Sequence, residues 1–159
     1  MKDINNEAME VAIEESEKNK NNDYTKGGPF GCAIVKGNKI IAKGHNTVVQ
    51  SKDPTAHAEI NAIRKACKEL DTHDLTGCVL YTSAEPCPMC LSAIIWANIK
   101  EVYYANTKEE VDEIGFRDDD IYDYLQGKNK RFIKLKQIDS EKAEDIFEDF
   151  KEIENKNIY

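Results

Sequence analysis

Residues 78–90 read Cys-Val-Leu-Tyr-Thr-Ser-Ala-Glu-Pro-Cys-Pro-Met-Cys. The apolar run over 78–82 predicts a short buried strand, and a proline-containing loop leads from it into a helix over about 87–97. Cys87 and Cys90 are three residues apart, so both thiols project from one face of the first helical turn. The dipole at a helix N-terminus favours the thiolate, which is the form that binds metals.

The elements around this strand and helix alternate along the chain. We expect a helix over 3–18, a β-hairpin of 30–36 and 39–46, a helix near 55–70, a strand over 102–105, helices over 107–113 and 119–126, a strand over 132–137 and a final helix over 140–154. Asp53-Pro54-Thr55 offers cap and first-turn residues for the 55–70 helix, and Ser140 offers a cap for the last one. The pattern predicts an α/β fold, a three-layer α/β/α arrangement with a central mixed sheet.

Composition limits the class of protein. The chain has 159 residues, a formal net charge of −8 and a pI near 5.0, which disfavours a partner bound through its phosphate backbone. The basic cluster over 128–131 reads as a solvated loop. No apolar run approaches the roughly 18 residues of a membrane span, and Met1 to Glu17 lacks the apolar stretch of a signal peptide. With an odd set of cysteines in no framework spacing, we expect a cytoplasmic protein with reduced thiols.

A second segment, His57-Ala58-Glu59, opens the other predicted helix. One His and two Cys make three ligands, a number that suits tetrahedral zinc with one position left to water. We therefore predict one zinc ion held by His57, Cys87 and Cys90, which would supply a hydroxide nucleophile near neutral pH. Glu59 is close enough to take the proton of that water and to pass it on to a substrate.

Simpler interpretations exist for each of these residues. A lone Cys-x-x-Cys also occurs in thioredoxin-like redox pairs and in structural zinc knuckles. The other cysteines and histidines show no paired ligand spacing: Cys32, Cys67 and Cys78 suit inert core thiols, His73 suits the surface, and His45 is given no role. Joined in one chain, however, His-x-Glu and Pro-Cys-x-x-Cys form the pattern of the zinc-dependent nucleobase deaminases.

The sequence resembles the bacterial guanine deaminases of the cytidine-deaminase-like zinc superfamily over nearly its whole length. The resemblance is carried by Gly27-Gly28-Pro29-Phe30-Gly31, Asp53-Pro54-Thr55-Ala56-His57-Ala58-Glu59, Tyr81-Thr82-Ser83 and Glu85-Pro86-Cys87-Pro88-Met89-Cys90, and extends through Trp96, Gly115-Phe116, Asp118, Ile121-Tyr122 and Tyr159. It implies hydrolysis of guanine to xanthine and ammonia on one zinc ion per subunit, with Glu59 as proton shuttle. Arg117 stands where the family has an acidic residue, and Ala84 replaces a common cysteine that is not a ligand.

The resemblance also implies roles for residues outside the zinc segments. Asn46 matches a base-reading asparagine whose amide offers both a donor and an acceptor, although it also suits the end of a strand. Phe30 and Trp96 match pocket residues, although both equally suit the core. Ala58 would offer its backbone N–H to the substrate carbonyl. Asp118 matches a second proton carrier, although a solvated acid at that position is as plausible.

The resemblance further implies how the chain assembles. We expect 1–127 to form the zinc deaminase core and 128–159 to form a C-terminal strand and helix that is swapped between the subunits of a homodimer. Tyr159 would then close over the pocket of the partner. Three rivals stay open: a tRNA adenosine deaminase, a deaminase of cytosine or another base, and a zinc-stabilised binding module without turnover. A purely structural zinc would have no use for Glu59.

Overall fold

The structure, a computed structural model, describes residues 3–129, 132–138 and 141–159. It divides into two compact units that meet between Tyr122 and Asp123, a few residues before the boundary expected at 127. The helices of the first unit are α1 (Ile4–Ser16), the 3-10 helix η1 (Lys20–Asn22), α2 (Val48–Ser51), α3 (Ala58–Leu70), α4 (Pro88–Trp96) and α5 (Lys108–Glu113), and α6 (Asp118–Leu125) crosses the boundary. The second unit holds α7 (Glu141–Lys151).

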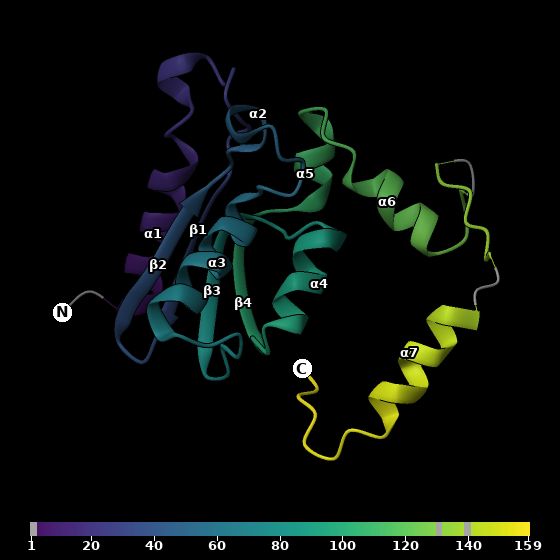
Figure 1. Cartoon of the computed structure of the whole chain (residues 1–159). Helices are drawn as coiled ribbons and strands as arrows, with labels where there is room; N and C mark the ends of the chain where they lie inside the picture. Colours follow the sequence, from purple (N-terminus) through teal and green to yellow (C-terminus); the bar gives the residue numbers. More distant parts are fainter. Residues whose placement is uncertain (1–2, 130–131, 139–140) are drawn as a thin grey trace. The chain divides into compact units, whose positions relative to one another are not determined.

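The first unit is built on one four-stranded sheet in the order β2-β1-β3-β4 (Figure 1). The strands are β1 (Gly31–Lys36), β2 (Lys39–His45), β3 (Cys78–Ala84) and β4 (Glu101–Asn106). Strand β1 pairs antiparallel with both β2 and β3, whereas β3 and β4 run parallel. The two directions in one sheet confirm the predicted mixed sheet, and the parallel pair needs the crossover that α4 supplies.

Alternation along β1 divides the core into two layers. Cys32 and Ile34 face α3 and α4, where they pack with Leu80 and Ile94. Ala33 and Val35 point to the opposite face and pack under α1. Because successive side chains of a strand point to opposite faces, one apolar strand serves both layers. The sheet thus lies between α1 on one side and α3 with α4 on the other, which confirms the three-layer prediction (Figure 1).

Glycine is required where α1 crosses the start of β1. A Cβ atom at Gly31 would lie 2.0 Å from the carbonyl oxygen of Ala12 and 2.4 Å from the backbone nitrogen of Ser16. The last turns of α1 therefore contact the backbone of β1 directly. This close approach brings the residues that follow α1 against the loops at the carboxyl end of β2.

Two sequence predictions were wrong. The helix expected from residue 55 begins at Ala58, because Asp53 closes a local turn by accepting from the Thr55 amide at 2.8 Å. The strand expected over 132–137 is not formed: residues 132–138 have no regular structure, and their apolar side chains are exposed. A strand needs a hydrogen-bonded neighbour, and alternation alone does not provide one. Ser140, the expected cap of the last helix, lies outside the described residues.

Within the residues that the structure describes, none of the helices is both long and apolar enough to cross a membrane.

Candidate active site

The first turns of α3 and α4 carry the residues with metal-binding side chains. His57 is the N-cap residue of α3, in an extended backbone conformation that ends the preceding turn. Cys87 is the N-cap residue of α4, and its sulfur accepts from the Cys90 amide at 3.5 Å. Both helices therefore begin at a ligand-bearing residue, and their free N–H groups and dipoles stabilise anionic sulfur there.

The three predicted ligands converge on one point. The His57 Nδ1 atom lies 3.6 Å from the Cys87 sulfur and 3.5 Å from the Cys90 sulfur, and the three ligand atoms lie within 4.8 Å of one another. Tetrahedral zinc with its usual Zn–S and Zn–N bond lengths separates a sulfur from a nitrogen by about 3.5 Å. The donor set and its spacing therefore fit zinc, and this is the one such cluster among the described residues.

The pKa values of the two thiols are shifted in opposite directions. The pKa of Cys87 is lowered to about 4, first by the hydrogen bond from Cys90 and then by His57, against the opposing effect of burial. The pKa of Cys90 is raised because its thiol donates to Cys87 and because it is buried. Metal ions bind cysteine as the thiolate, so metal binding displaces the protons that the two sulfurs carry.

Glu59 lies beside this cluster with its carboxylate held at both ends. Its Oε1 accepts from the Thr82 hydroxyl at 3.1 Å, and the Cys90 thiol approaches its Oε2 at 3.4 Å. The side chain is only 6% exposed. Burial raises the pKa of Glu59 above its usual value, which suits a group that both takes and returns a proton.

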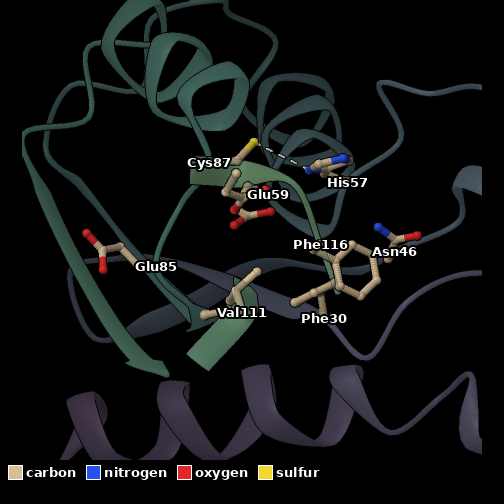
Figure 2. A pocket seen from close by; sticks show the side chains of 10 residues that line it. Phe30, Asn46, His57, Glu59, Glu85, Cys87, Val111 and Phe116 are labelled. Carbon is tan, nitrogen blue, oxygen red and sulfur yellow. Dashed lines mark hydrogen bonds between the residues drawn. The ribbon is translucent and has the colours of Figure 1, made fainter. Parts of the chain in front are cut away.

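A pocket opens in front of these groups and encloses about 380 Å³, part of it open to solvent. Figure 2 shows His57, Glu59 and Cys87 on one side and Asn46, Phe30 and Phe116 on the other. The two phenylalanine rings meet edge to face, 4.8 Å between centroids. A concave site that combines apolar rings with a few convergent polar groups is typical of a site for a small molecule.

Asn46 faces the pocket with its amide nitrogen. Its Oδ1 accepts from the backbone amides of Gly28 at 3.3 Å and Val48 at 3.2 Å, which uses both lone pairs. Figure 2 shows the nitrogen on the side of His57 and the oxygen turned away. The backbone therefore occupies the acceptor that we expected this amide to offer, and the donor faces the pocket.

The other residues singled out from the sequence lie in different places. Asp118, the first residue of α6, lines the pocket, and burial followed by the Cys87 thiolate raises its pKa to about 6. Ala58 is buried at the first turn of α3, next to His57. Trp96 ends α4, is 61% exposed, and is not part of the lining of this pocket. Tyr159 belongs to the second unit, whereas this pocket belongs to the first, so the role of Tyr159 stays a prediction.

Sequence reasoning assigned no role to several residues that the structure brings to the site. Thr82, from the strand β3, donates to Glu59. The pocket lining also includes Ala84, Glu85, Val111 and Phe116. The Glu85 carboxylate accepts a hydrogen bond from the Lys108 backbone amide at 3.0 Å. The one available signal was that Thr82, Glu85 and Phe116 stand inside the segments that carry the family resemblance.

Known proteins share this arrangement. A guanine deaminase of Bacillus subtilis (strain 168) is 59% identical over 96 residues, which are 60% of this chain and 62% of that protein. A tRNA-specific adenosine deaminase of Aquifex aeolicus is 44% identical over 98 residues, or 61% of this chain and 62% of that protein. These alignments span less than two thirds of the length of either relative.

A solved structure extends the likeness to the whole fold. The X-ray structure of guanine deaminase from Bacillus subtilis superposes with a TM-score of 0.88 at 42% identity, covering 97% of this chain and 98% of that one. The family profile of the cytidine and deoxycytidylate deaminase zinc-binding region matches residues 2–106, the part of the chain that supplies all three ligands and Glu59. The chain belongs to this family of zinc-binding deaminases.

Proposed function

We propose that the chain hydrolyses guanine to xanthine and ammonia, as a zinc-dependent aminohydrolase of the cytoplasm. The observation that carries the proposal is the position of Glu59, a buried carboxylate beside three zinc ligands at the inner end of a pocket for a small molecule. A structural zinc site is closed by a fourth protein ligand, whereas a catalytic site keeps one position open. The cluster of described ligands numbers three.

Each side chain then has a distinct task. Zinc, when bound to His57, Cys87 and Cys90, supplies Lewis-acid activation of water. Glu59 takes one proton from the attacking water and passes it to the ring nitrogen. It then takes the second proton from the new hydroxyl on the ring carbon and passes it to the departing amine, which leaves poorly unless it is protonated. Asp118, which also lines the pocket, is the second proton carrier.

The other side of the pocket holds the base. Phe30 and Phe116 offer apolar faces for a flat ring. Asn46 offers its amide hydrogens, which pair with an acceptor on the base such as a carbonyl oxygen or an unprotonated ring nitrogen. Ala58 supplies a backbone N–H at the helix N-terminus, and the site excludes water around the ring while the amine is replaced.

The second unit supports a homodimer. All described residues of 123–159 are at least partly exposed. The helix α7 carries exposed Ile146, Phe147 and Phe150, and Ile153 just after the helix is exposed as well. Apolar side chains grouped in this way are normally covered. We infer a dimer in which this segment is exchanged and in which Tyr159 and Trp96 complete pockets. Light scattering at micromolar concentration should give twice the mass of the chain, and a monodisperse monomer would contradict the dimer.

An ammonia-release assay tests the substrate. Zinc-loaded protein is offered guanine, adenine, cytosine, their nucleosides and a tRNA anticodon stem-loop at equal concentration. We expect guanine to be turned over fastest, because the net charge of −8 disfavours a polyanion and the pocket suits a free base. Turnover of the stem-loop without turnover of guanine would favour a tRNA adenosine deaminase, the activity named for several relatives of this chain.

A further inference from the structure

Asn19 is a buried amide outside the pocket. It follows α1, is 2% exposed, and points its side-chain nitrogen at two backbone carbonyls. The nitrogen donates to the carbonyl oxygen of Asn46 at 2.8 Å and to that of Gly28 at 3.1 Å. A buried asparagine that joins two loops has to be fully hydrogen-bonded to be tolerated there, so its position is set by both carbonyls at once.

These bonds belong to a closed circuit around the side chain of Asn46. Asn19 holds the carbonyl of Gly28, and the amide of the same Gly28 donates to Asn46 Oδ1 at 3.3 Å. Asn19 also holds the main chain of Asn46, whose own amide donates to the Phe30 carbonyl at 3.1 Å. The residue that presents a donor to the pocket is therefore fixed at its backbone and at its side-chain oxygen.

The packing around the circuit leaves no room for adjustment. A Cβ atom at Gly27 would lie 2.4 Å from the Asn46 carbonyl oxygen, 2.7 Å from Asn46 Oδ1 and 2.9 Å from Asn19 Nδ2. Position 27 therefore has to be glycine, because the two oxygens of Asn46 and the side-chain nitrogen of Asn19 leave no room for a Cβ atom there. The hydrogen bonds and the close approach at Gly27 are independent observations, and both restrict the position of Asn46.

We propose that Asn19 is a positioning residue for recognition of the base, which rests on the proposed role of Asn46. Without its two bonds, Gly28 moves away from Asn46 Oδ1 and the amide of Asn46 can rotate. The base must then order that amide on binding, so its affinity falls. The groups that carry the chemistry, Glu59 and the three ligands, lie on α3 and α4 and keep their geometry.

The test uses the zinc-loaded full chain with Asn19→Ala and the milder Asn19→Ser, whose hydroxyl can keep one of the two bonds. We expect KM to rise about tenfold in Asn19→Ala and less in Asn19→Ser, with kcat within about threefold of the parent and zinc content unchanged. Asn5→Ala is the matched control, because it removes the side-chain oxygen on α1 that accepts from the Tyr81 hydroxyl and touches neither Gly28 nor Asn46. Its KM should not change.

A double-mutant cycle separates positioning from general destabilisation. If Asn19 acts through Asn46, the KM of Asn19→Ala/Asn46→Ala equals that of Asn46→Ala alone. KM effects that multiply, or an equal KM rise in Asn5→Ala, would overturn the proposal. Should neither Asn19 variant fold, hydrogen exchange of the Asn19 side-chain amide in the parent protein decides: slow exchange means that its bonds to the Asn46 and Gly28 carbonyls are held, and fast exchange means that they are not.

Failure of this proposal can be told apart from failure of the proposed function. If the parent protein turns over another base and not guanine, the substrate assignment is wrong, and the cycle is repeated with the accepted base. If the parent protein turns over guanine and the cycle shows independent effects, the assignment stands and the positioning role of Asn19 is wrong.

Discussion

The pocket has two sides of different construction. Its metal side, defined as His57, Glu59, Cys87 and Cys90, comes from the first turns of two helices. Its base side, defined as Phe30, Asn46 and Phe116, comes from strand ends and loops that are far apart in the chain. Helix geometry fixes the metal side locally, whereas long-range hydrogen bonds and packing fix the base side.

This difference predicts which kinetic constant each side controls. A change on the metal side alters groups that act on the reacting atoms and should appear in kcat. A change on the base side alters groups that hold the ring in the ground state as well as in the transition state, and should appear mainly in KM. Substitutions on the two sides test whether the division is real.

The largest effect is expected at the metal side, for Glu59→Gln. Glutamine keeps the shape and can still accept from Thr82, but it cannot carry a proton between water and leaving amine. We expect kcat to fall by about a thousandfold, within the usual range for a general acid–base group, with zinc still bound at one per chain. Steady-state kinetics with metal analysis by mass spectrometry measures both. Unchanged turnover would mean that the metal is purely structural.

On the base side, Asn46→Ala should give the next largest effect. The substitution removes the donor that faces the pocket and leaves the amides of Gly28 and Val48 without their acceptor. We expect kcat/KM for guanine to fall about a hundredfold, most of it in KM, because a site built to pair with a polar group loses affinity without it. Zinc content should not change. A loss confined to kcat would break the division between the two sides.

The metal side could be predicted from the sequence, and the base side could not. His57, Cys87 and Cys90 have a spacing that places ligands at helix N-termini, and the structure brings them together as expected. Phe30 and Asn46 were named only through family resemblance. The orientation of the Asn46 amide depends on Gly28 and Val48, and no periodicity in the sequence reports such a contact.

A smaller effect is expected for Thr82→Val, which alters the support of Glu59 on the metal side. Valine has nearly the same shape and suits a strand, but it cannot donate to Glu59 Oε1. The carboxylate then loses one of the contacts that orient it, so we expect kcat to fall about tenfold with KM and zinc content unchanged. The measurement is the same pair of assays as for Glu59→Gln. A rise in KM equal to the fall in kcat would instead place Thr82 with the base side.

The fold shows the same limit of sequence-based prediction. The four strands and the helices α1, α3, α4, α5 and α6 were expected from the sequence pattern, whereas the short helices η1 and α2 were not. The predicted strand over 132–137 has the alternation but no pairing partner among the described residues. The early start predicted for α3 failed because Asp53 bonds to Thr55 instead of capping the helix. Patterns predict burial, and specific side-chain contacts then decide where elements begin.

The smallest effect is expected for Glu15, a residue of α1 that contacts Lys43 and His45 on β2, the strand that leads into Asn46. Glu15 on α1 is 2% exposed, with Lys18 at 2.8 Å, Lys43 at 3.4 Å and His45 Nδ1 at 3.4 Å. Burial alone would raise the pKa of Glu15, but Lys18 and then Lys43 outweigh it and hold the pKa below its usual value of 4.5. A lowered pKa means that the ionised carboxylate stabilises the fold above that value. The stabilisation is lost as the pH falls through the folded-state pKa.

Glu15→Gln keeps the shape and removes the charge. Since both lysines are about half exposed and screened by solvent, we expect the free energy of unfolding to fall by about 1 kcal/mol at pH 7. Urea unfolding of parent and variant at pH 7 and at pH 3.5 measures the difference, which should shrink at the lower pH because pH 3.5 lies below the ordinary glutamate pKa of 4.5, where the unfolded parent chain binds a proton. A difference of equal size at both pH values would mean that Glu15 contributes packing and not charge. In that case the position of α1 next to β1 and β2 would depend on its close contact with Gly31, and this contact does not change with pH.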